Sequence, residues 1–268
     1  MEKVFTNMAS RHDVPNLFVP LAQILEGDID VRDEALTQAS HDASYISIRP
    51  QVVLYPKNSQ DIGRIFAFAK EYRLPLSICG NGTSTSGGSL TEGMQINVSR
   101  YFTKVHKVDL KNNTATVDAG ITVEKLVVRF AELGVRCPIL SFETKARTLG
   151  GIVAENATTQ ATATHGDIRS WIHGVNLVLD NGEEHHIEEN LNPTGRLLEI
   201  YENIHPLLRA QSGNVYASQN RMLSSTSGYN VWNQSIGLKQ LLDIIVGSEG
   251  TLGVITTITL RVVPLTKH

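Results

Sequence analysis

A strand, a helix and a second strand follow one another between residues 52 and 78, and this pattern constrains the fold more than any other feature of the chain. The run from Val52 to Tyr55 is apolar, β-branched and closed by a proline, which is typical of a buried strand. Ser59 can cap the helix that follows, whose apolar residues repeat at spacings of three and four up to Tyr72. Leu76 to Ile78 then predicts another strand. Because a helical crossover of this length is right-handed and joins parallel strands, we expect a parallel pair.

The later part of the chain predicts antiparallel strands. Residues 105–118 are expected to form a hairpin that turns at Asn112-Asn113, since asparagine tolerates a left-handed backbone. A second hairpin is expected where residues 171–179 are followed by Asn181-Gly182, the strongest two-residue hairpin signal. Residues 253–263 are rich in β-branched side chains and predict a long terminal strand.

Helical patterns complete the expected architecture. Thr122 can cap a helix that ends at Gly134, and residues 194–210 predict another helix. The class is therefore expected to be α+β, with two α/β subdomains and mixed sheets. The expected divisions are an amino-terminal extension over residues 1–45, a first subdomain over 46–104 and a second over 105–268.

Composition and charge argue against several classes of protein. The chain has 268 residues, with 24 Lys and Arg against 27 Asp and Glu, so we expect no nucleic-acid surface, because phosphate-driven binding needs clustered cations. Cys79 and Cys137 are too few for a disulfide scaffold. No apolar run approaches the ~20 residues of a membrane span, and residues 1–5 lack the apolar block of a signal peptide. The expected location is the cytoplasm, at most peripheral to a membrane, with no transmembrane segment.

The segment from Cys79 to Gly88 is the most informative for function. It follows a predicted strand directly, its glycines allow backbone N–H groups to approach an anion, and its Thr and Ser hydroxyls add donors. No lysine follows the glycines, so it is not a Walker loop, and polar residues rather than an apolar helix come next, so it is not a Rossmann fingerprint. The segment predicts a diphosphate cradle, with an ordinary surface loop as the alternative.

Two further glycine-rich segments follow, over residues 148–158 and 247–253. Each could be a tight turn. Three such segments, each expected at the end of a strand, favour a long dinucleotide, because such a ligand needs several close approaches of the backbone.

Three stretches carry a resemblance to a known family. Residues 75–84 resemble the P-V/I-x-x-R-G-G-G-T-S loop of flavoproteins with a vanillyl-alcohol-oxidase type, or PCMH-type, FAD-binding domain. Residues 148–158 are similar to its T-I/L-G-G-x-I/V-A-N-N-A-S-G segment, and residues 246–256 match its V-G-S-E-G-T-L-G-V-I-T. The resemblance covers about residues 42 to 264, and the branch most similar to the chain is the D-lactate dehydrogenase and glycolate oxidase type.

The resemblance implies FAD in an extended pose between the two subdomains. It implies the diphosphate on the loop from Gly80 to Ser84, the isoalloxazine near residues 148–158, and the adenine near Gly250 and Val254. Family members that attach FAD covalently carry a histidine where Thr83 stands, so non-covalent binding is expected. The residues assigned to the cofactor in this way are Cys79, Gly80, Asn81, Gly82, Thr83, Ser84, Gly87, Thr148, Gly151, Ala154, Ala157, Thr158, Gly250 and Val254.

The chain departs from the family pattern at four motif positions. Cys79 replaces the arginine that precedes the glycines, and Asn81 replaces the middle glycine. Asparagine is the non-glycine residue that best tolerates a left-handed backbone, so the turn is expected to be preserved. Glu155 replaces an asparagine and Thr159 replaces a glycine, and both changes alter the expected contacts with the flavin ring.

Family enzymes continue beyond the terminal strand into a cap domain that carries metal-ligand and acid/base histidines, so the chain is expected to be a fragment that lacks its cap. Residues 42–45 and 227–230 resemble large forms with a fused iron–sulfur region, which is therefore a possible partner. His185-His186 are expected to be exposed, and no metal site is expected. His165 either lines the flavin pocket or lies in a surface loop. Cys79 either is redox-active or is an inert buried thiol.

The function that the resemblance implies is oxidation of a small 2-hydroxy acid such as D-lactate or glycolate, with hydride passing to flavin N5. Catalytic residues are not identified. One alternative is the flavin subunit of a molybdenum hydroxylase-type complex, which relays electrons from another subunit. Another is a non-enzymatic nucleotide-binding module in which the glycine-rich loops are structural.

Overall fold

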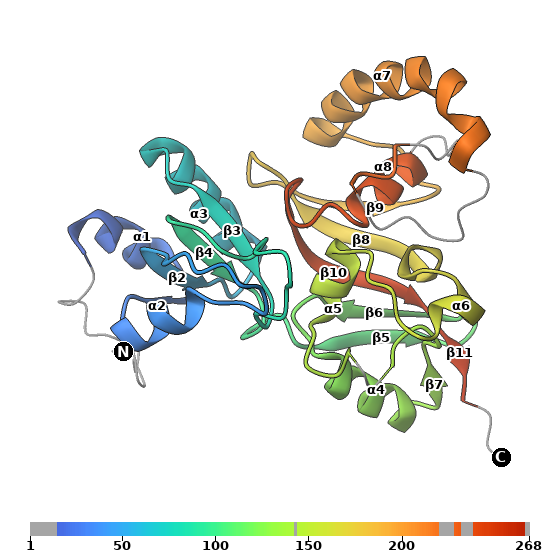
Figure 1. The fold of residues 1–268 in the computed structure, drawn as a ribbon, viewed down its shortest axis with the longest axis horizontal. Coiled ribbons are helices and arrows are strands. Elements are labelled where there is room, and N and C mark those ends of the chain that lie inside the picture. The colour runs from blue at the N-terminus through green and yellow to red at the C-terminus, as the bar shows by residue number, and fades with distance from the viewer. Residues whose placement is uncertain (1–14, 142–143, 220–227, 232–237, 266–268) are drawn as a thin grey trace.

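The computed structural model describes residues 15–141, 144–219, 228–231 and 238–265. Ser227 and the first part of the expected amino-terminal extension lie outside these residues. Two subdomains stand side by side, the first built on a four-stranded sheet and the second on a five-stranded sheet (Figure 1).

The first sheet is mixed. Its strand order is β1-β2-β4-β3, formed by Asp28–Asp30, Val52–Tyr55, Met94–Asn97 and Leu76–Cys79. Both β2 and β3 run parallel to β4, which confirms the predicted parallel direction, but β4 lies between the two predicted strands. The sequence did not predict β4, because it is only four residues long and two of them are polar.

Three helices accompany this sheet: α1 (Val19–Ile24), α2 (Asp33–Ala39) and α3 (Ser59–Tyr72). The helix α3 has the predicted extent, but its N-cap is Asn58 rather than Ser59, because the Asn58 side chain accepts a hydrogen bond from the N–H of Asp61 at 2.9 Å. β1 pairs antiparallel with β2, so residues 28–30 belong to the first sheet. The boundaries at residues 45 and 104 stay predictions.

The second sheet is antiparallel throughout. Its order is β5-β6-β10-β8-β9, formed by Val105–Asp109, Thr114–Asp118, Val254–Arg261, Ile172–Val178 and Glu184–Glu188. Both predicted hairpins are confirmed: β5 pairs with β6 and β8 with β9. Asn113 and Gly182 take the left-handed backbone of the two turns, with φ of 53° and 84°.

The predicted terminal strand is divided. Its main part, β10, is the central strand of the second sheet and pairs on one side with β6 and on the other with β8. Val263–Pro264 form β11, which leaves this sheet and pairs with β7 (Val135–Arg136). The chain is therefore bent after Arg261, where a single continuous strand was expected.

Helices of the second subdomain agree with the sequence in part. Thr122 caps α4 (Val123–Glu132) as predicted, and Gly134 follows it with φ of 72°. The helix predicted over 194–210 is α7, which extends over Gly195–Gln219. Short helical segments, α6 (Thr162–His165) and η3 (Ile168–Trp171), precede β8, and no helix of the described residues is long and apolar enough to cross a membrane.

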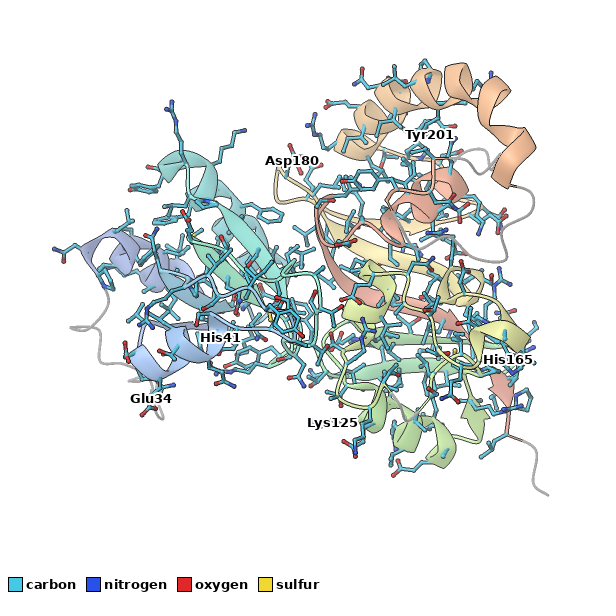
Figure 2. The ribbon with its side chains drawn as sticks, in the orientation of Figure 1. Glu34, His41, Lys125, His165, Asp180 and Tyr201 are labelled. Atoms are coloured by element: carbon cyan, nitrogen blue, oxygen red, sulfur yellow. The ribbon has the colours of Figure 1, made fainter. Side chains whose placement is uncertain are left out.

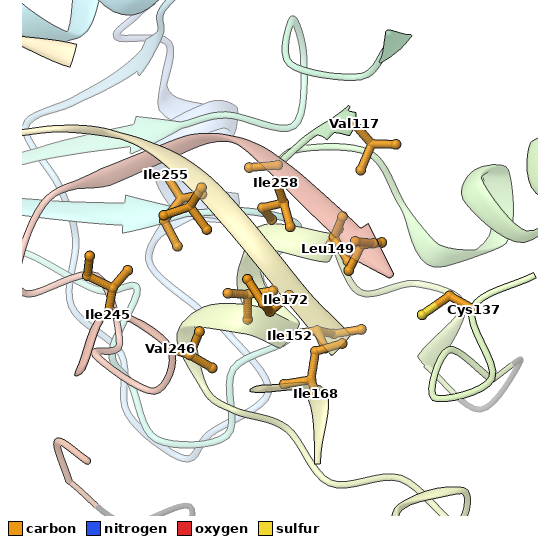
Figure 3. Close-up of a cluster of buried hydrophobic side chains, with 14 of the residues drawn as sticks. Val117, Cys137, Leu149, Ile152, Ile168, Ile172, Ile245, Val246, Ile255 and Ile258 are labelled. Carbon is orange, nitrogen blue, oxygen red and sulfur yellow. The ribbon is translucent and has the colours of Figure 1, made fainter. Parts of the chain in front are cut away.

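The second glycine-rich segment does not lie at the end of a strand, which corrects the sequence prediction. Residues Leu149–Ala154 form the helix α5, whose N-cap is Thr148. The apolar run before Gly247 is the helix α8 (Leu238–Ile245), so the third segment joins a helix to the start of β10. Tertiary packing stabilises α5 despite its two glycines, because Leu149 and Ile152 are buried among strand residues such as Ile172 and Ile258 (Figure 3).

The two subdomains have separate hydrophobic cores that share a border. The core of the first contains Phe18, Leu54 and Ile62, and also Val178 and Val254 from the second subdomain. Both of these valines are fully buried. Burying a valine stabilises a fold by roughly 1.5 to 3 kcal/mol, so these contacts stabilise the packing of the two subdomains against each other.

Candidate functional site

A cleft lies between the two subdomains, with a cavity volume of about 90 Å³. This volume is smaller than that of most small-molecule sites, roughly 300 to 1,000 Å³. All three glycine-rich segments line it. The lining residues are Ile78, Gly80, Asn81, Gly82, Thr83, Ser84, Ser86, Gly88, Ser89, Val98, Ala119, Thr148, Gly150, Gly151, Ala154, Glu155, Ser248, Glu249, Gly250, Gly253 and Ile255.

The loop after β3 forms the first wall of the cleft. Gly82 has φ of 65°, and a Cβ built on it would meet no heavy atom closer than the carbonyl oxygen of His41 at 3.9 Å. The left-handed residue of this loop is thus Gly82, whereas we expected Asn81 to carry that conformation. Asn81 has another role, since its side-chain amide donates to the carbonyl oxygen of Ala146 at 2.9 Å and so connects the two walls.

Residues 41–47 support this loop from outside. The N–H of Ala43 donates to the carbonyl oxygen of Ser84 at 2.9 Å, and the Ser89 hydroxyl donates to the Asp42 carboxylate at 3.4 Å. Gly87 has φ of 77°, and a Cβ on it would lie 2.8 Å from Cδ1 of Ile46. Gly87 therefore allows the close approach of Ile46 and does not line the cleft.

The helix α5 forms the opposite wall. Its cap, Thr148, accepts a hydrogen bond from the N–H of Gly151 at 3.3 Å. The N–H of Gly150 donates to the carbonyl oxygen of Ala119 at 2.6 Å, and a Cβ on Gly150 would lie 2.9 Å from that oxygen. Thr148 also faces the first wall, because a Cβ on Gly80 would lie 2.1 Å from Oγ1 of Thr148. Glycine is needed at both positions by packing.

The segment from Gly247 to Gly253 completes the wall. The N–H of Gly247 donates to the carbonyl oxygen of Val153 at 3.0 Å, and the N–H of Glu249 donates to that of Ala154 at 2.8 Å. These bonds hold the segment against the end of α5. Glu249 and Gly250 both have positive φ, 52° and 78°.

Charge in the cleft is limited to carboxylates. Among the described lining residues there is no Lys, Arg or His, and the acidic side chains are Glu155 and Glu249. Glu155 is paired with Arg147, which lies outside the lining. A diphosphate in this cleft would be bound by backbone N–H groups and by the hydroxyls of Thr83, Ser84 and Ser86. Successive backbone N–H groups form anion-binding concavities of this kind in proteins. The residues present therefore fit a nucleotide diphosphate.

Most residues that the sequence assigned to the cofactor lie in this cleft. Those in its walls are Gly80, Asn81, Gly82, Thr83, Ser84, Thr148, Gly151, Ala154 and Gly250. The walls do not include Cys79, Gly87, Ala157, Thr158 or Val254. Cys79, Ala157 and Val254 are buried in the packing behind the walls, and Thr158 is exposed beyond the end of α5. Contact of any of these residues with a cofactor stays a prediction.

Sequence reasoning missed several residues of the cleft. Gly150, Glu249 and Gly253 lie inside two of the glycine-rich segments, so the sequence alone could have assigned them to the cleft. Ala119, Val98 and Ile255 come from other segments and gave no local signal, because only the packing of the two sheets brings them to the cleft.

The cysteines and histidines that the sequence offered as candidates do not line the cleft. Burial raises the pKa of the Cys79 thiol, and it raises the pKa of Cys137 to about 12, so both thiols are held protonated. His165 stands at the side of the second subdomain that faces away from the first (Figure 2), with its ring edge-on to Trp171 at 6.2 Å between centroids. His185 pairs with Glu183, and His186 with Glu188. The described residues contain no group of three or more His, Cys, Asp or Glu placed to hold a metal ion.

A mixed sheet and an antiparallel sheet meet at a cleft whose backbone N–H groups and hydroxyls fit a nucleotide diphosphate. The chain belongs to the FAD binding domain family, whose model matches residues 50–188. The resemblance inferred from the three motifs is thereby confirmed.

Curated relatives name three related activities. The chain is 25% identical over 256 residues to a D-2-hydroxyglutarate dehydrogenase of Pseudomonas putida. The aligned region covers 90% of this chain and 25% of the relative. It is 26% identical to glycolate oxidase subunit GlcD of Bacillus subtilis, covering 80% of this chain and 37% of the relative. It is 25% identical to a D-lactate dehydrogenase of Anaerostipes hadrus, and the aligned region covers 94% of this chain and 45% of the relative. The chain thus spans a quarter to less than half of the length of these relatives.

Solved structures share the fold. The chain superposes on an alkyldihydroxyacetonephosphate synthase with a TM-score of 0.67 at 17% identity, covering 98% of this chain and 44% of that one. It superposes on 6-hydroxy-D-nicotine oxidase from Arthrobacter nicotinovorans with a TM-score of 0.63 at 15% identity, covering 90% and 43%. The predicted α+β fold of two FAD-binding subdomains is confirmed.

Proposed function

We propose that this chain is the FAD-binding part of a flavin-dependent oxidoreductase that oxidises a small 2-hydroxy acid such as D-lactate, glycolate or D-2-hydroxyglutarate. The observation that carries the proposal is the cleft in which three glycine-rich segments, far apart in the sequence, converge. The named activities of the relatives support the substrate class.

The two walls of the cleft bind different parts of the cofactor. The loop from Gly80 to Ser84 offers N–H groups and hydroxyls to the diphosphate, and the packed wall of α5 offers a flat surface of small residues to the flavin ring. When bound, FAD supplies hydride acceptance at flavin N5. The chain's own residues bind and orient it, and α5 keeps water from one of its faces.

Binding is proposed to be non-covalent, because Thr83 occupies the position of the histidyl linkage in covalent members of the family. The test is acid precipitation of the FAD-loaded protein. Flavin should remain in the supernatant, and yellow colour in the washed pellet would contradict the proposal.

Groups that recognise and deprotonate the substrate are proposed to come from outside the cleft. A 2-hydroxy acid carries a carboxylate, and the described cleft walls offer no cation to bind it and no histidine to act as a base. Such groups would be supplied by a cap domain or a partner, with an iron–sulfur region or subunit as the proposed electron acceptor.

The substrate class is tested in the native host. The Gly82→Asn substitution is introduced into the gene, and extracts are assayed for dye-linked oxidation of D-lactate, glycolate and D-2-hydroxyglutarate. Loss of one of these activities, restored by the wild-type gene, supports the proposal. Retention of all three would contradict the proposed substrate class.

A further inference from the structure

An ion pair lies beside the helix α5 in the cleft wall. Arg147 precedes the N-cap Thr148, and Glu155 is the C-cap residue at the other end of the helix. Nη2 of Arg147 donates to Oε2 of Glu155. The backbone fixes both residues. The N–H of Glu155 donates to the carbonyl oxygen of Gly151 at 3.0 Å, and the carbonyl oxygen of Arg147 accepts from the N–H of Val123 at 2.9 Å. The pair is therefore an ordered part of the wall.

The surroundings of this pair are poor in water and in other partners. The side chains of Arg147 and Glu155 are 22% and 31% exposed. Within the described part of the chain the guanidinium of Arg147 has no other ion-pair or hydrogen-bond partner, and its Nε is buried without a hydrogen bond. Partly buried charges are screened much less than exposed ones. Because Glu155 lines the cleft, the charges of the pair act on whatever the cleft holds.

The stability of α5 gives no reason for a carboxylate at this position. The C-terminal end of a helix carries a partial negative charge, so an acidic side chain there is unfavourable. Glu155 stands at that end, and the paired guanidinium of Arg147 offsets its charge. A role toward the ligand accounts for a charged pair that helix stability does not require.

Charge beside a flavin affects how readily the flavin is reduced. When a 2-hydroxy acid gives up hydride, two electrons and one proton reach the flavin, the hydroxyl proton is released, and a 2-oxo acid forms. The flavin thereby gains one negative charge, which a nearby carboxylate opposes and a nearby guanidinium favours. The described cleft walls carry two carboxylates, Glu155 and Glu249, and Arg147 is the only cation among the described residues that pairs with either.

We propose that the Arg147–Glu155 pair tunes the reduction equilibrium of the bound flavin, with Glu155 favouring the oxidised form and Arg147 favouring the reduced form. The inference rests on the proposed function, because it takes FAD as the ligand of the cleft.

The experiment loads the chain with FAD and reduces it anaerobically together with a reference dye of known potential. The absorbances of flavin and dye give the ratio of reduced to oxidised flavin at equilibrium. Glu155→Gln is expected to raise this ratio roughly tenfold, about 30 mV for a two-electron couple. Arg147→Gln should lower it by a similar factor, and the double variant should lie between the two, close to wild type.

Opposite shifts distinguish this role from a structural one. Each single variant breaks the same ion pair, so both should lower the thermal midpoint slightly, while the reduction equilibrium moves in opposite directions. The matched control is the exposed pair Arg129–Glu132 of α4, which is outside the cleft walls. Arg129→Gln and Glu132→Gln should keep the wild-type ratio.

Shifts of both single variants in the same direction would overturn the inference, as would wild-type ratios in both or equal shifts in the control pair. If Arg147→Gln does not fold, Glu155→Gln alone decides, because an unchanged or lowered ratio there contradicts the proposal. Loss of FAD from a variant with a normal thermal midpoint would assign the pair to cofactor binding instead. Failure of wild-type protein to bind FAD would contradict the proposed function itself.

Discussion

In the loop that forms the first wall of the cleft, a Cβ on Gly82 would meet no heavy atom closer than 3.9 Å, whereas in the helix of the opposite wall a Cβ on Gly150 would lie 2.9 Å from the oxygen of Ala119. Both positions hold glycine, but for different physical reasons. Gly150 is required by packing within the protein. Gly82 has a positive φ and faces open space, as expected where a ligand approaches the backbone.

The two walls also differ in how they are held. Backbone hydrogen bonds join helix α5 to Ala119, which follows β6, and to the 247–253 segment, and the apolar side chains of α5 are buried in the second core. The first wall is a loop with exposed and half-exposed residues, supported by residues 41–47 and by the amide of Asn81. Substitutions in the helix wall should therefore lower stability, and substitutions in the loop wall should lower affinity for FAD.

The largest effect is expected for Gly150→Val. The added side chain would collide with the backbone of Ala119, and overpacking of this kind costs roughly 1 to 3 kcal/mol. Urea denaturation followed by circular dichroism measures the loss. Gly88→Ala is the control, since a Cβ there would make only ordinary contacts at 3.5 Å or more and should leave stability within about 0.5 kcal/mol of wild type. Similar losses for both variants would remove the distinction between the walls.

Gly82→Asn should weaken the binding of FAD and leave the stability nearly unchanged. Asparagine tolerates the left-handed backbone, so the free energy of unfolding should change little, while its side chain enters the space facing the cleft. The dissociation constant for FAD is expected to rise at least roughly tenfold, about 1.4 kcal/mol. Fluorescence titration gives the constant. Unchanged affinity would assign this glycine to a turn without contact to the ligand.

Asn81→Ala tests the connection between the walls. It removes the hydrogen bond from Asn81 to the carbonyl oxygen of Ala146, which contributes about 0.5 to 1.5 kcal/mol. Because this bond is exposed, we expect a loss of stability near the lower limit and an FAD affinity about two- to threefold weaker. An effect on neither quantity would mean that the walls are positioned by the shared valine core alone.

A pair outside the cleft gives the smallest expected effect. The carboxylate of Asp180, at the tip of the β8–β9 hairpin (Figure 2), accepts two hydrogen bonds from Arg196, and these hold the pKa of Asp180 below its usual value of 3.8. The stabilisation is present above that value and is lost as the pH falls through the lowered pKa. Because both side chains are largely exposed, Asp180→Asn should be only slightly less stable than wild type at pH 7 and should match it in strong acid. A difference that grows on acidification would contradict this account.

Sequence periodicity was sufficient for β2, α3, β3 and both hairpins, because their apolar spacing and turn residues are local signals. It failed for α5, where two consecutive glycines disfavour a helix and only burial of Leu149 and Ile152 in the second core stabilises it. It also failed for β4, which is short and half polar, and for α8, whose short apolar run does not distinguish strand from helix.

The candidate site also contains some residues that the sequence could predict and others that it could not. The glycine-rich segments could be recognised as a ligand-binding set from their residue types. Ala119 and Ile255 could not, since their position in the cleft depends on how the second sheet packs against α5. The role of Asn81 was also beyond the sequence, because its partner Ala146 is 65 residues away.

The central claim is that the cleft binds FAD, and the most direct measurement is the absorbance spectrum of the purified chain before and after addition of FAD and removal of the excess by gel filtration. The account predicts a flavin spectrum that co-elutes with the protein in equimolar amount and that is reduced in Gly82→Asn. A colourless protein peak from correctly folded wild-type chain would contradict it.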